Sequence, residues 1–86
     1  MNPQFAYFYL MRDEPDRVRA AVPRHMAHWR GLGLAGYRGG PFADRTGGLI
    51  TFEADDGGRA SAAVDTDPFV QEGLLDAYWL KHWAPE

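Results

Sequence analysis

The chain of 86 residues contains no cysteine. This absence excludes disulfide bonds, thiolate metal ligands and a cysteine nucleophile. It also fits a reducing cytoplasm, which is the compartment where we expect the protein to act. At this length the chain is expected to form one domain, residues 1–86, with a core of modest size.

Long hydrophobic runs are missing as well. The apolar run closest to the N-terminus, Phe5 to Met11, covers seven residues and follows no basic segment. A membrane-spanning helix needs about 20 apolar residues, and a signal peptide needs a basic segment before its apolar core. The sequence therefore predicts neither, and we expect no membrane partner.

Positive charge is scarce and dispersed. Nine Lys and Arg residues stand against twelve Asp and Glu residues, which gives a formal net charge of −3. A surface that binds nucleic acid gathers its basic residues in one place. Here the arginines between Arg12 and Arg30 are interleaved with acids or spaced along a predicted helix, so we expect no nucleic-acid partner.

Common catalytic motifs are absent too. The chain has no phosphate-binding loop and no serine in a nucleophile elbow. An enzyme made from this chain would therefore use non-covalent acid–base chemistry or a bound cofactor.

The apolar pattern predicts an alternating series of strands and helices. Strands are predicted at 4–11, 37–42, 48–55 and 76–83, and helices at 22–35 and 58–65, with short helical turns at 16–21 and after Asp67. Pro23 lacks an N–H, so it either begins or kinks a helix, and we expect the main helix to begin there. The order βαββαβ predicts a ferredoxin-like α+β fold, with a four-stranded antiparallel sheet and two helices on one face.

Both faces of the outer strands are apolar. On the first strand Phe5, Tyr7 and Tyr9 alternate with Ala6, Phe8 and Leu10, and on the last strand Tyr78 and Leu80 alternate with Trp79 and Trp83. Two helices cover only one face, and a sheet face exposed to water is normally polar. We therefore expect a homodimer with the sheets face to face, or a higher oligomer built from it.

The segment VPRHMAHWRGL, residues 22–32, contains two histidines three residues apart. On a regular helix they share one face. A metal site would need a further ligand such as Asp67 or His82, and none lies near them in the sequence. Acid–base catalysis needs only one histidine held by a carboxylate. A structural role in capping or packing is the third reading, and spacing alone favours it.

Asp67 precedes a proline in the segment TDPF. Its side chain is placed to cap the helical turn that Pro68 begins. A capping carboxylate can also pair with a histidine. Asp44, Asp65 and Asp76 have weaker claims to a function, because they fall in predicted turns, where Asp is common.

The aromatic residues of the outer strands have two compatible readings. They form the core and a dimer interface, or they also form the apolar wall of a ligand pocket. Both readings concern the same four residues, Tyr7, Tyr9, Trp79 and Trp83.

Four motifs, in this order and spacing, resemble those of the YciI-like (YCII-related) family of the dimeric α+β barrel superfamily. They are PRHMAHWRGL, GGPF at 39–42, DPFVQEGLL at 67–75 and LKHW at 80–83. The first has a proline two residues before its histidine, which selects His25 rather than His28. His82 stands where the family commonly has proline, and GLGLAGYRGGPF is shorter and richer in glycine than is usual.

The resemblance implies a dimer and an active site built on His25 and Asp67. It also implies relatives of lyase or isomerase type that act on small cyclic compounds. Our hypothesis is a small acid–base enzyme without metal or cofactor, in which Tyr7, Tyr9, Phe42 and Trp83 bind the substrate. His28 is then a supporting surface residue and Trp29 a core anchor. The alternatives are a non-catalytic ligand binder with the same cleft, and a haem- or metal-dependent enzyme.

Overall fold

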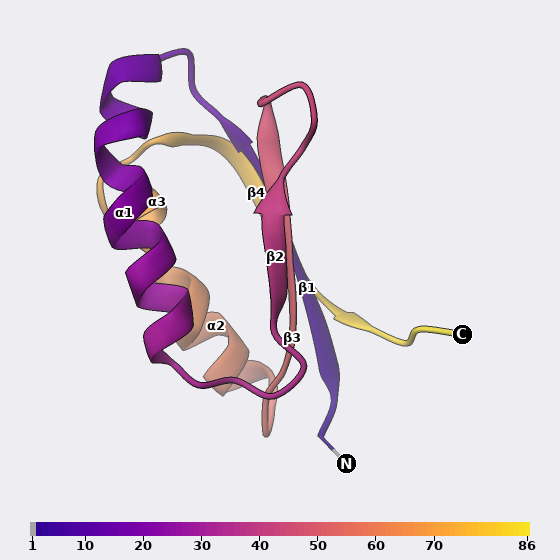
Figure 1. Ribbon diagram of the computed structural model, residues 1–86. Helices are drawn as coiled ribbons and strands as arrows, with labels where there is room; N and C mark the ends of the chain where they lie inside the picture. Colours follow the sequence, from indigo (N-terminus) through magenta and orange to yellow (C-terminus); the bar gives the residue numbers. More distant parts are fainter. Residues whose placement is uncertain (1) are drawn as a thin grey trace.

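The computed structural model describes residues 2–86, which form a single sheet with helices on one side (Figure 1). In chain order the elements are β1 (Gln4–Met11), α1 (Pro15–Gly31), β2 (Arg38–Pro41), β3 (Gly47–Glu53), α2 (Gly57–Asp65), α3 (Pro68–Gln71) and β4 (Leu75–Trp83). The strands follow the order β2-β3-β1-β4 and all neighbours are antiparallel. The predicted ferredoxin-like βαββαβ fold is therefore confirmed.

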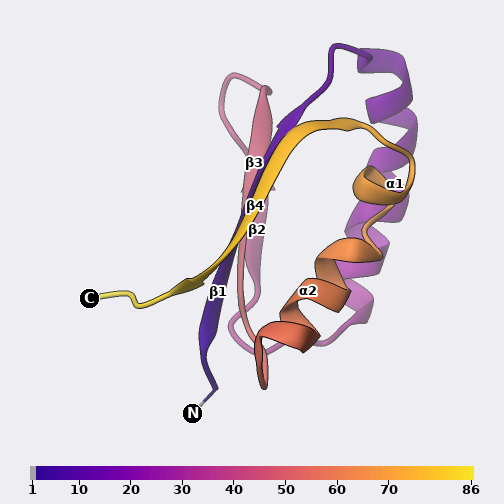
Figure 2. The same ribbon diagram turned by 180° about the vertical axis from the view of Figure 1, so that it is seen from behind.

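The core lies between the sheet and the helices, which cover the same face (Figure 2). β1 contributes Phe5, Tyr7 and Tyr9 to it, and α1 contributes Ala21, His25 and Trp29. The three α1 residues are four apart, so one stripe of the helix faces the sheet. None of the helices formed by residues 2–86 combines the length and apolarity required to cross a membrane.

The opposite sheet face carries large apolar side chains that remain uncovered. Phe8 lies between Leu49 of β3 and Trp79 of β4 in the strand register, and Trp83 follows along β4. These four side chains are between 39% and 46% exposed. The predicted apolar alternation of the first and last strands is confirmed, but the prediction that the first strand is an outer strand is wrong, because β1 pairs with both β3 and β4. The two-layer protomer leaves this face open.

The predicted break at Pro23 is wrong. A single helix begins at Pro15, passes through Pro23 and ends at Gly31 rather than at residue 35. Pro15 already occupies the first turn, where the missing N–H costs nothing. An interior proline costs about 3 kcal/mol, but the helix keeps Trp29 and Ala21 fully buried against the sheet. Tertiary packing thus outweighs the local cost.

We predict that Pro23→Ala stabilises the protein by up to about 3 kcal/mol, because it restores one backbone hydrogen bond inside α1. Urea unfolding of the two proteins measures the difference. Pro15→Ala is the matched control and should change stability little, since the first helical turn tolerates proline. A loss of stability in Pro23→Ala would contradict this account of α1.

Candidate active site

The site is organised around the carboxylate of Asp67, which is completely buried. Asp67 lies between α2 and α3 and caps α3, since its Oδ1 accepts a hydrogen bond from the backbone N–H of Phe69 at 2.9 Å. Pro68 begins α3, as the sequence predicted. The short turn therefore aims the carboxylate at the core instead of at solvent.

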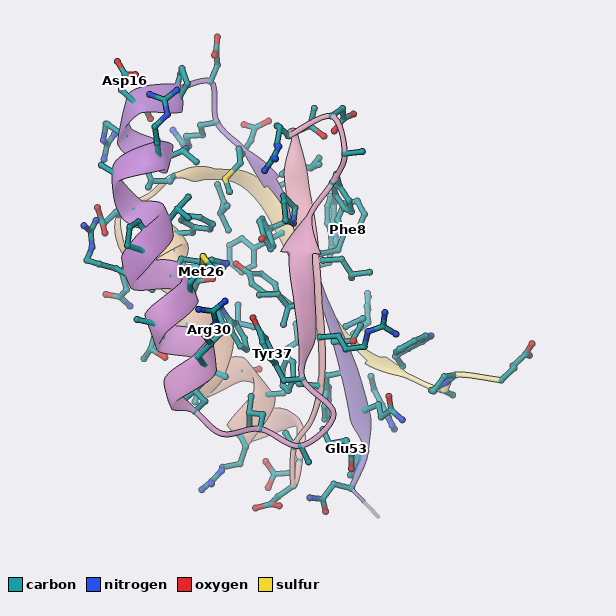
Figure 3. The ribbon with its side chains drawn as sticks, viewed as in Figure 1. Phe8, Asp16, Met26, Arg30, Tyr37 and Glu53 are labelled. Atoms are coloured by element: carbon teal, nitrogen blue, oxygen red, sulfur yellow. The ribbon has the colours of Figure 1, made fainter. Side chains whose placement is uncertain are left out.

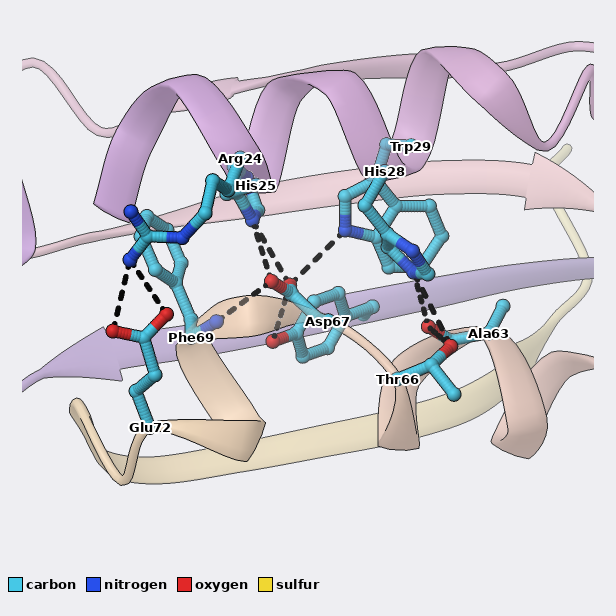
Figure 4. A network of polar contacts seen from close by, with 10 residues as sticks. Arg24, His25, His28, Trp29, Ala63, Thr66, Asp67, Phe69 and Glu72 are labelled. Carbon is cyan, nitrogen blue, oxygen red and sulfur yellow. Dashed lines mark hydrogen bonds and ion pairs between the residues drawn. The ribbon is translucent and has the colours of Figure 1, made fainter. Parts of the chain in front are cut away.

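Three side chains from two other elements also donate hydrogen bonds to this carboxylate (Figure 4). His25 Nδ1 lies 2.9 Å from Oδ1 and 3.0 Å from Oδ2. Trp29 Nε1 donates to Oδ2 at 3.0 Å, and the Tyr7 hydroxyl donates to Oδ2 at 3.2 Å. A buried carboxylate needs such partners, because an unpaired charge in the interior is very unfavourable.

These donors decide the protonation state of Asp67. Burial by itself raises the pKa of the carboxyl group, but the hydrogen bond and charge of His25, together with the bonds from Trp29 and Phe69, outweigh burial. The pKa of Asp67 therefore lies below its ordinary value. Burial and the nearby Asp67 charge raise the pKa of both Tyr7 and Tyr9, so each remains a neutral phenol.

His25 is held in one orientation. Its ring stacks on Phe69, with the centroids 4.0 Å apart and an angle of 11° between the planes. Because Asp67 holds Nδ1, the other ring nitrogen, Nε2, is left without a bond to Asp67. No described residue forms a hydrogen bond with Nε2. In residues 2–86, every side-chain nitrogen or oxygen atom that is buried from solvent does have a hydrogen-bond partner. Nε2 is therefore open to solvent.

A cavity of about 410 Å³ lies beside this ring, between α1 and the β2–β3 half of the sheet. Most of its wall is apolar, formed by Tyr9, Met11, Val18, Val22, Met26, Pro41, Ile50 and Phe69. Its polar side chains are His25, Tyr37, Arg30 and Arg45. Nothing in the lining is acidic. This volume falls in the range that holds small organic molecules.

The structure brings together four of the six predicted site residues, His25, Asp67, Tyr7 and Tyr9, and separates the other two. Tyr9 lines the cavity with His25, while Tyr7 lies behind it in the core and bonds to Asp67. Phe42 and Trp83 line a different hollow of about 760 Å³, which also contains the outer-face residue Leu49. Within one protomer these two aromatic residues do not share a cavity with His25.

His28 has a structural contact. Its Nε2 donates to the carbonyl oxygen of Ala63 at 2.8 Å, which ties α1 to α2. Asp44 bonds to Thr46 in the β2–β3 turn. Within residues 2–86, no group of three or more His, Cys, Asp and Glu side chains is arranged to hold a metal ion.

Sequence reasoning missed three residues of the site. Trp29 is a core anchor as expected, but its indole N–H is also an Asp67 ligand. Arg30 and Tyr37 line the cavity without having been singled out. A signal for Arg30 was present, because it continues the four-residue spacing of Val18, Val22 and Met26 along one row of the helix.

The comparisons with known proteins identify the family and agree with the fold. The sequence model of the YCII-related domain family matches residues 5–84, so the chain belongs to that family. A search of curated proteins finds no match. Among solved structures, the chain is similar to the 5-chloro-2-hydroxyhydroquinone dehydrochlorinase of Burkholderia phenoliruptrix, determined in complex with 2,5-dihydroxybenzoquinone. The two are 25% identical over 94% of this chain and 93% of that chain, with a TM-score of 0.80.

We predict that Asp67 makes stability depend on acid pH. Its pKa is depressed in the folded protein, so its contribution is present above the ordinary value of 3.8 and is lost as the pH falls through the lower folded value. Urea unfolding at a series of acid pH values should show this loss in the wild type. In Asp67→Asn the loss should be smaller, because that proton uptake no longer occurs.

Asp65→Asn is the matched control, since Asp65 is exposed at the end of α2. It should keep the wild-type pH profile. An unchanged profile in Asp67→Asn would show that the Asp67 contacts do not set the acid stability.

Proposed function

We propose that the protein is a cofactor-independent acid–base enzyme of lyase or isomerase type that acts on a small cyclic compound. The observation that carries this proposal is the pairing of His25 Nδ1 with the buried Asp67 carboxylate at 2.9 Å, beside a cavity. The similar dehydrochlorinase supports the substrate class. We also propose that the chain works as one domain in the cytoplasm.

Asp67 would act by positioning His25. An Nδ1–H that donates to the carboxylate leaves the lone pair on Nε2, which is the atom that accepts a proton. The imidazolium that forms is then stabilised by the Asp67 charge. General acid–base catalysis of this kind contributes about a hundred- to ten-thousandfold in rate. That factor suits ring compounds that already tautomerise readily.

The proposed reaction on a chlorinated hydroxyhydroquinone needs no oxidant. His25 Nε2 takes the proton of the ring hydroxyl next to the C–Cl carbon and returns it to that carbon, which gives the keto tautomer. A second hydroxyl then loses its proton, its oxygen becomes a carbonyl, and the displaced electrons expel chloride with its bonding pair. The products are a hydroxyquinone and HCl.

The cavity wall supports a planar ring as the substrate. Tyr9, Ile50 and Phe69 offer apolar surface on the side of His25. Phe69 also keeps the imidazole plane fixed by stacking on it. A ring held against these side chains would present its hydroxyl groups to Nε2, which is the geometry that proton transfer needs.

We further propose that the open sheet face packs against a second copy of the chain. Phe8, Leu49 and Trp79 form an apolar row across three strands, and Trp83 lies on the same face of β4, four residues beyond Trp79. A two-fold dimer buries the same patch of both copies. It would also cover the hollow lined by Phe42 and Trp83, so these residues would belong to the interface.

The proposed function predicts that the His25→Gln variant loses turnover but remains folded. With 5-chloro-2-hydroxyhydroquinone as the test substrate, chloride release should fall by at least about a hundredfold, because the general base is lost. His28→Gln is the matched control, since His28 contacts a backbone carbonyl away from the cavity. It should retain turnover. Full activity in His25→Gln would remove His25 from the mechanism.

Binding without turnover would instead identify a ligand-binding protein. In that case 2,5-dihydroxybenzoquinone should perturb the NMR signals of His25 in the wild type, while no chlorinated hydroxyhydroquinone is converted. The two outcomes separate an enzyme from a binder that uses the same cavity.

The dimer proposal predicts that the protein sediments at micromolar concentration with the mass of two chains. Trp79→Lys should give a folded monomer, because it places a charge in the centre of the apolar face. Ala20→Lys adds the same charge on the exposed side of α1 and should leave the dimer intact. A wild-type monomer under these conditions would contradict the proposal.

A further inference from the structure

One end of the cavity carries positive charge that no described residue neutralises. Arg30, in the last turn of α1, lines the cavity together with Tyr37, which precedes β2. Figure 3 shows the two side chains pointing toward one another from opposite sides of the gap between helix and sheet. Within residues 2–86, neither the guanidinium nor the phenol has a hydrogen-bond or ion-pair partner.

Other arginines of the same helix differ in this respect. Arg17, Arg19 and Arg24 pair with Glu14, Asp16 and Glu72. All three ion pairs involve residues outside the cavity lining. The chain is acidic as a whole, with a net charge of −3. Among the arginines of α1, Arg30 is therefore the one without an acidic partner in residues 2–86, and it borders a cavity whose lining has no carboxylate.

The position of Tyr37 is set by its neighbours Trp29 and Gly39. Its ring lies parallel to the Trp29 indole, at a centroid distance of 6.4 Å and an angle of 7°. Gly39 leaves room for it, since a Cβ at that position would come within 3.0 Å of the Tyr37 hydroxyl. The phenol thus lies beside the cavity next to Trp29 and Gly39, and neither neighbour uses its hydrogen-bonding capacity.

The positions along α1 relate this corner to the proposed base. His25 and Arg30 are five residues apart, which is about 7.5 Å along a helix axis. Arg45 lies in the hairpin after β2, at the end of that strand opposite Tyr37, so it does not join Arg30 at one ligand atom. A ring next to His25 with one substituent toward the α1 C-terminus would meet Arg30 and Tyr37 only.

We infer that Arg30 and Tyr37 form a subsite for a planar oxyanion on the ring substrate, namely a carboxylate or an ionised hydroxyquinone oxygen. Guanidinium groups match the geometry of such anions with parallel donors. The Tyr37 hydroxyl adds a third donor from the opposite wall. The inference rests on the proposed function, which supplies the ring substrate, and it adds that this substrate carries a negative charge.

The test compares two ring probes of the same shape that differ in charge. Binding of 2,5-dihydroxybenzoate and of the neutral 2,5-dihydroxybenzamide is measured at neutral pH by NMR titration, for the wild type, Arg30→Met, Tyr37→Phe and Arg19→Met. The wild type should prefer the benzoate by about ten- to hundredfold, the factor expected for a charge-assisted hydrogen bond. Arg30→Met should remove the preference without changing the affinity for the amide.

The other two variants make the test specific. Tyr37→Phe should reduce the preference in part, and it keeps the test valid if Arg30→Met is poorly folded. Arg19→Met removes an exposed charge from the same helix and should keep the full preference. A merely structural arginine in the last helical turn would affect stability through the helix dipole, but it would not affect the benzoate-to-amide ratio.

A third probe, 2,5-dihydroxybenzoquinone, distinguishes the two sources of the anion, because its hydroxyl groups ionise as those of a vinylogous acid. Loss of its binding in Arg30→Met, without benzoate binding in the wild type, assigns the subsite to a ring oxygen. Loss of benzoate binding alone assigns it to a carboxylate. Equal affinity for benzoate and amide together with unchanged quinone binding in Arg30→Met would overturn the inference, as would failure of the wild type to bind either anion.

These results are independent of the proposed proton transfer. If Arg30→Met keeps the charge preference while His25→Gln abolishes turnover, the oxyanion subsite is wrong and the enzyme proposal stands. If His25→Gln retains turnover while Arg30→Met loses the preference, the role of His25 is wrong and the subsite stands.

Discussion

A single buried carboxylate organises this protein. Asp67 is removed from water, and an uncompensated charge there would be strongly destabilising. Four donors compensate it, from β1, α1 and the first turn of α3. Because these donors come from segments far apart in the chain, the charge is satisfied only when the strand, the long helix and the short helix are in place together.

Stability and the proposed chemistry therefore depend on the same contacts. The hydrogen bonds from Trp29 and Tyr7 keep the carboxylate fixed, and the fixed carboxylate orients His25. His25 and Trp29 lie one turn apart on α1, so the helix presents both to Asp67 at once. A strand and a helix hold the three side-chain donors, and Asp67 itself lies in the short connection between α2 and α3, where its cap of α3 fixes it.

Local sequence signals predicted the parts of the site that depend on local structure. The Asp-Pro pair predicted the cap of α3, and strand alternation predicted which aromatic residues of β1 share a face. The continuation of α1 through Pro23 was missed, because burial of Trp29 against the sheet outweighs the local cost and is not visible in the sequence. The bonds from Tyr7 and Trp29 to Asp67 span 60 and 38 residues, and no spacing rule reaches so far.

The placement of Phe42 and Trp83 shows a second limit of sequence patterns. Alternation indicates that a side chain lies on one face of a strand, but it does not indicate which cavity that face borders. Both aromatic residues lie by the hollow next to Leu49, whereas the His25 cavity lies under α1. Predicting that they bind the ring assumed a single cleft, and the two-layer fold has a hollow on each side of its sheet.

This arrangement places two roles on neighbouring residues of β1. Tyr7 points inward and donates to Asp67, while Phe8 points outward between Leu49 and Trp79. Strand geometry alone separates the two faces, since successive side chains point in opposite directions. A partner packed on Phe8 would restrain the same backbone that positions Tyr7. Assembly would then limit the motion of the carboxylate network from behind, while leaving the cavity beside His25 open to its ligand.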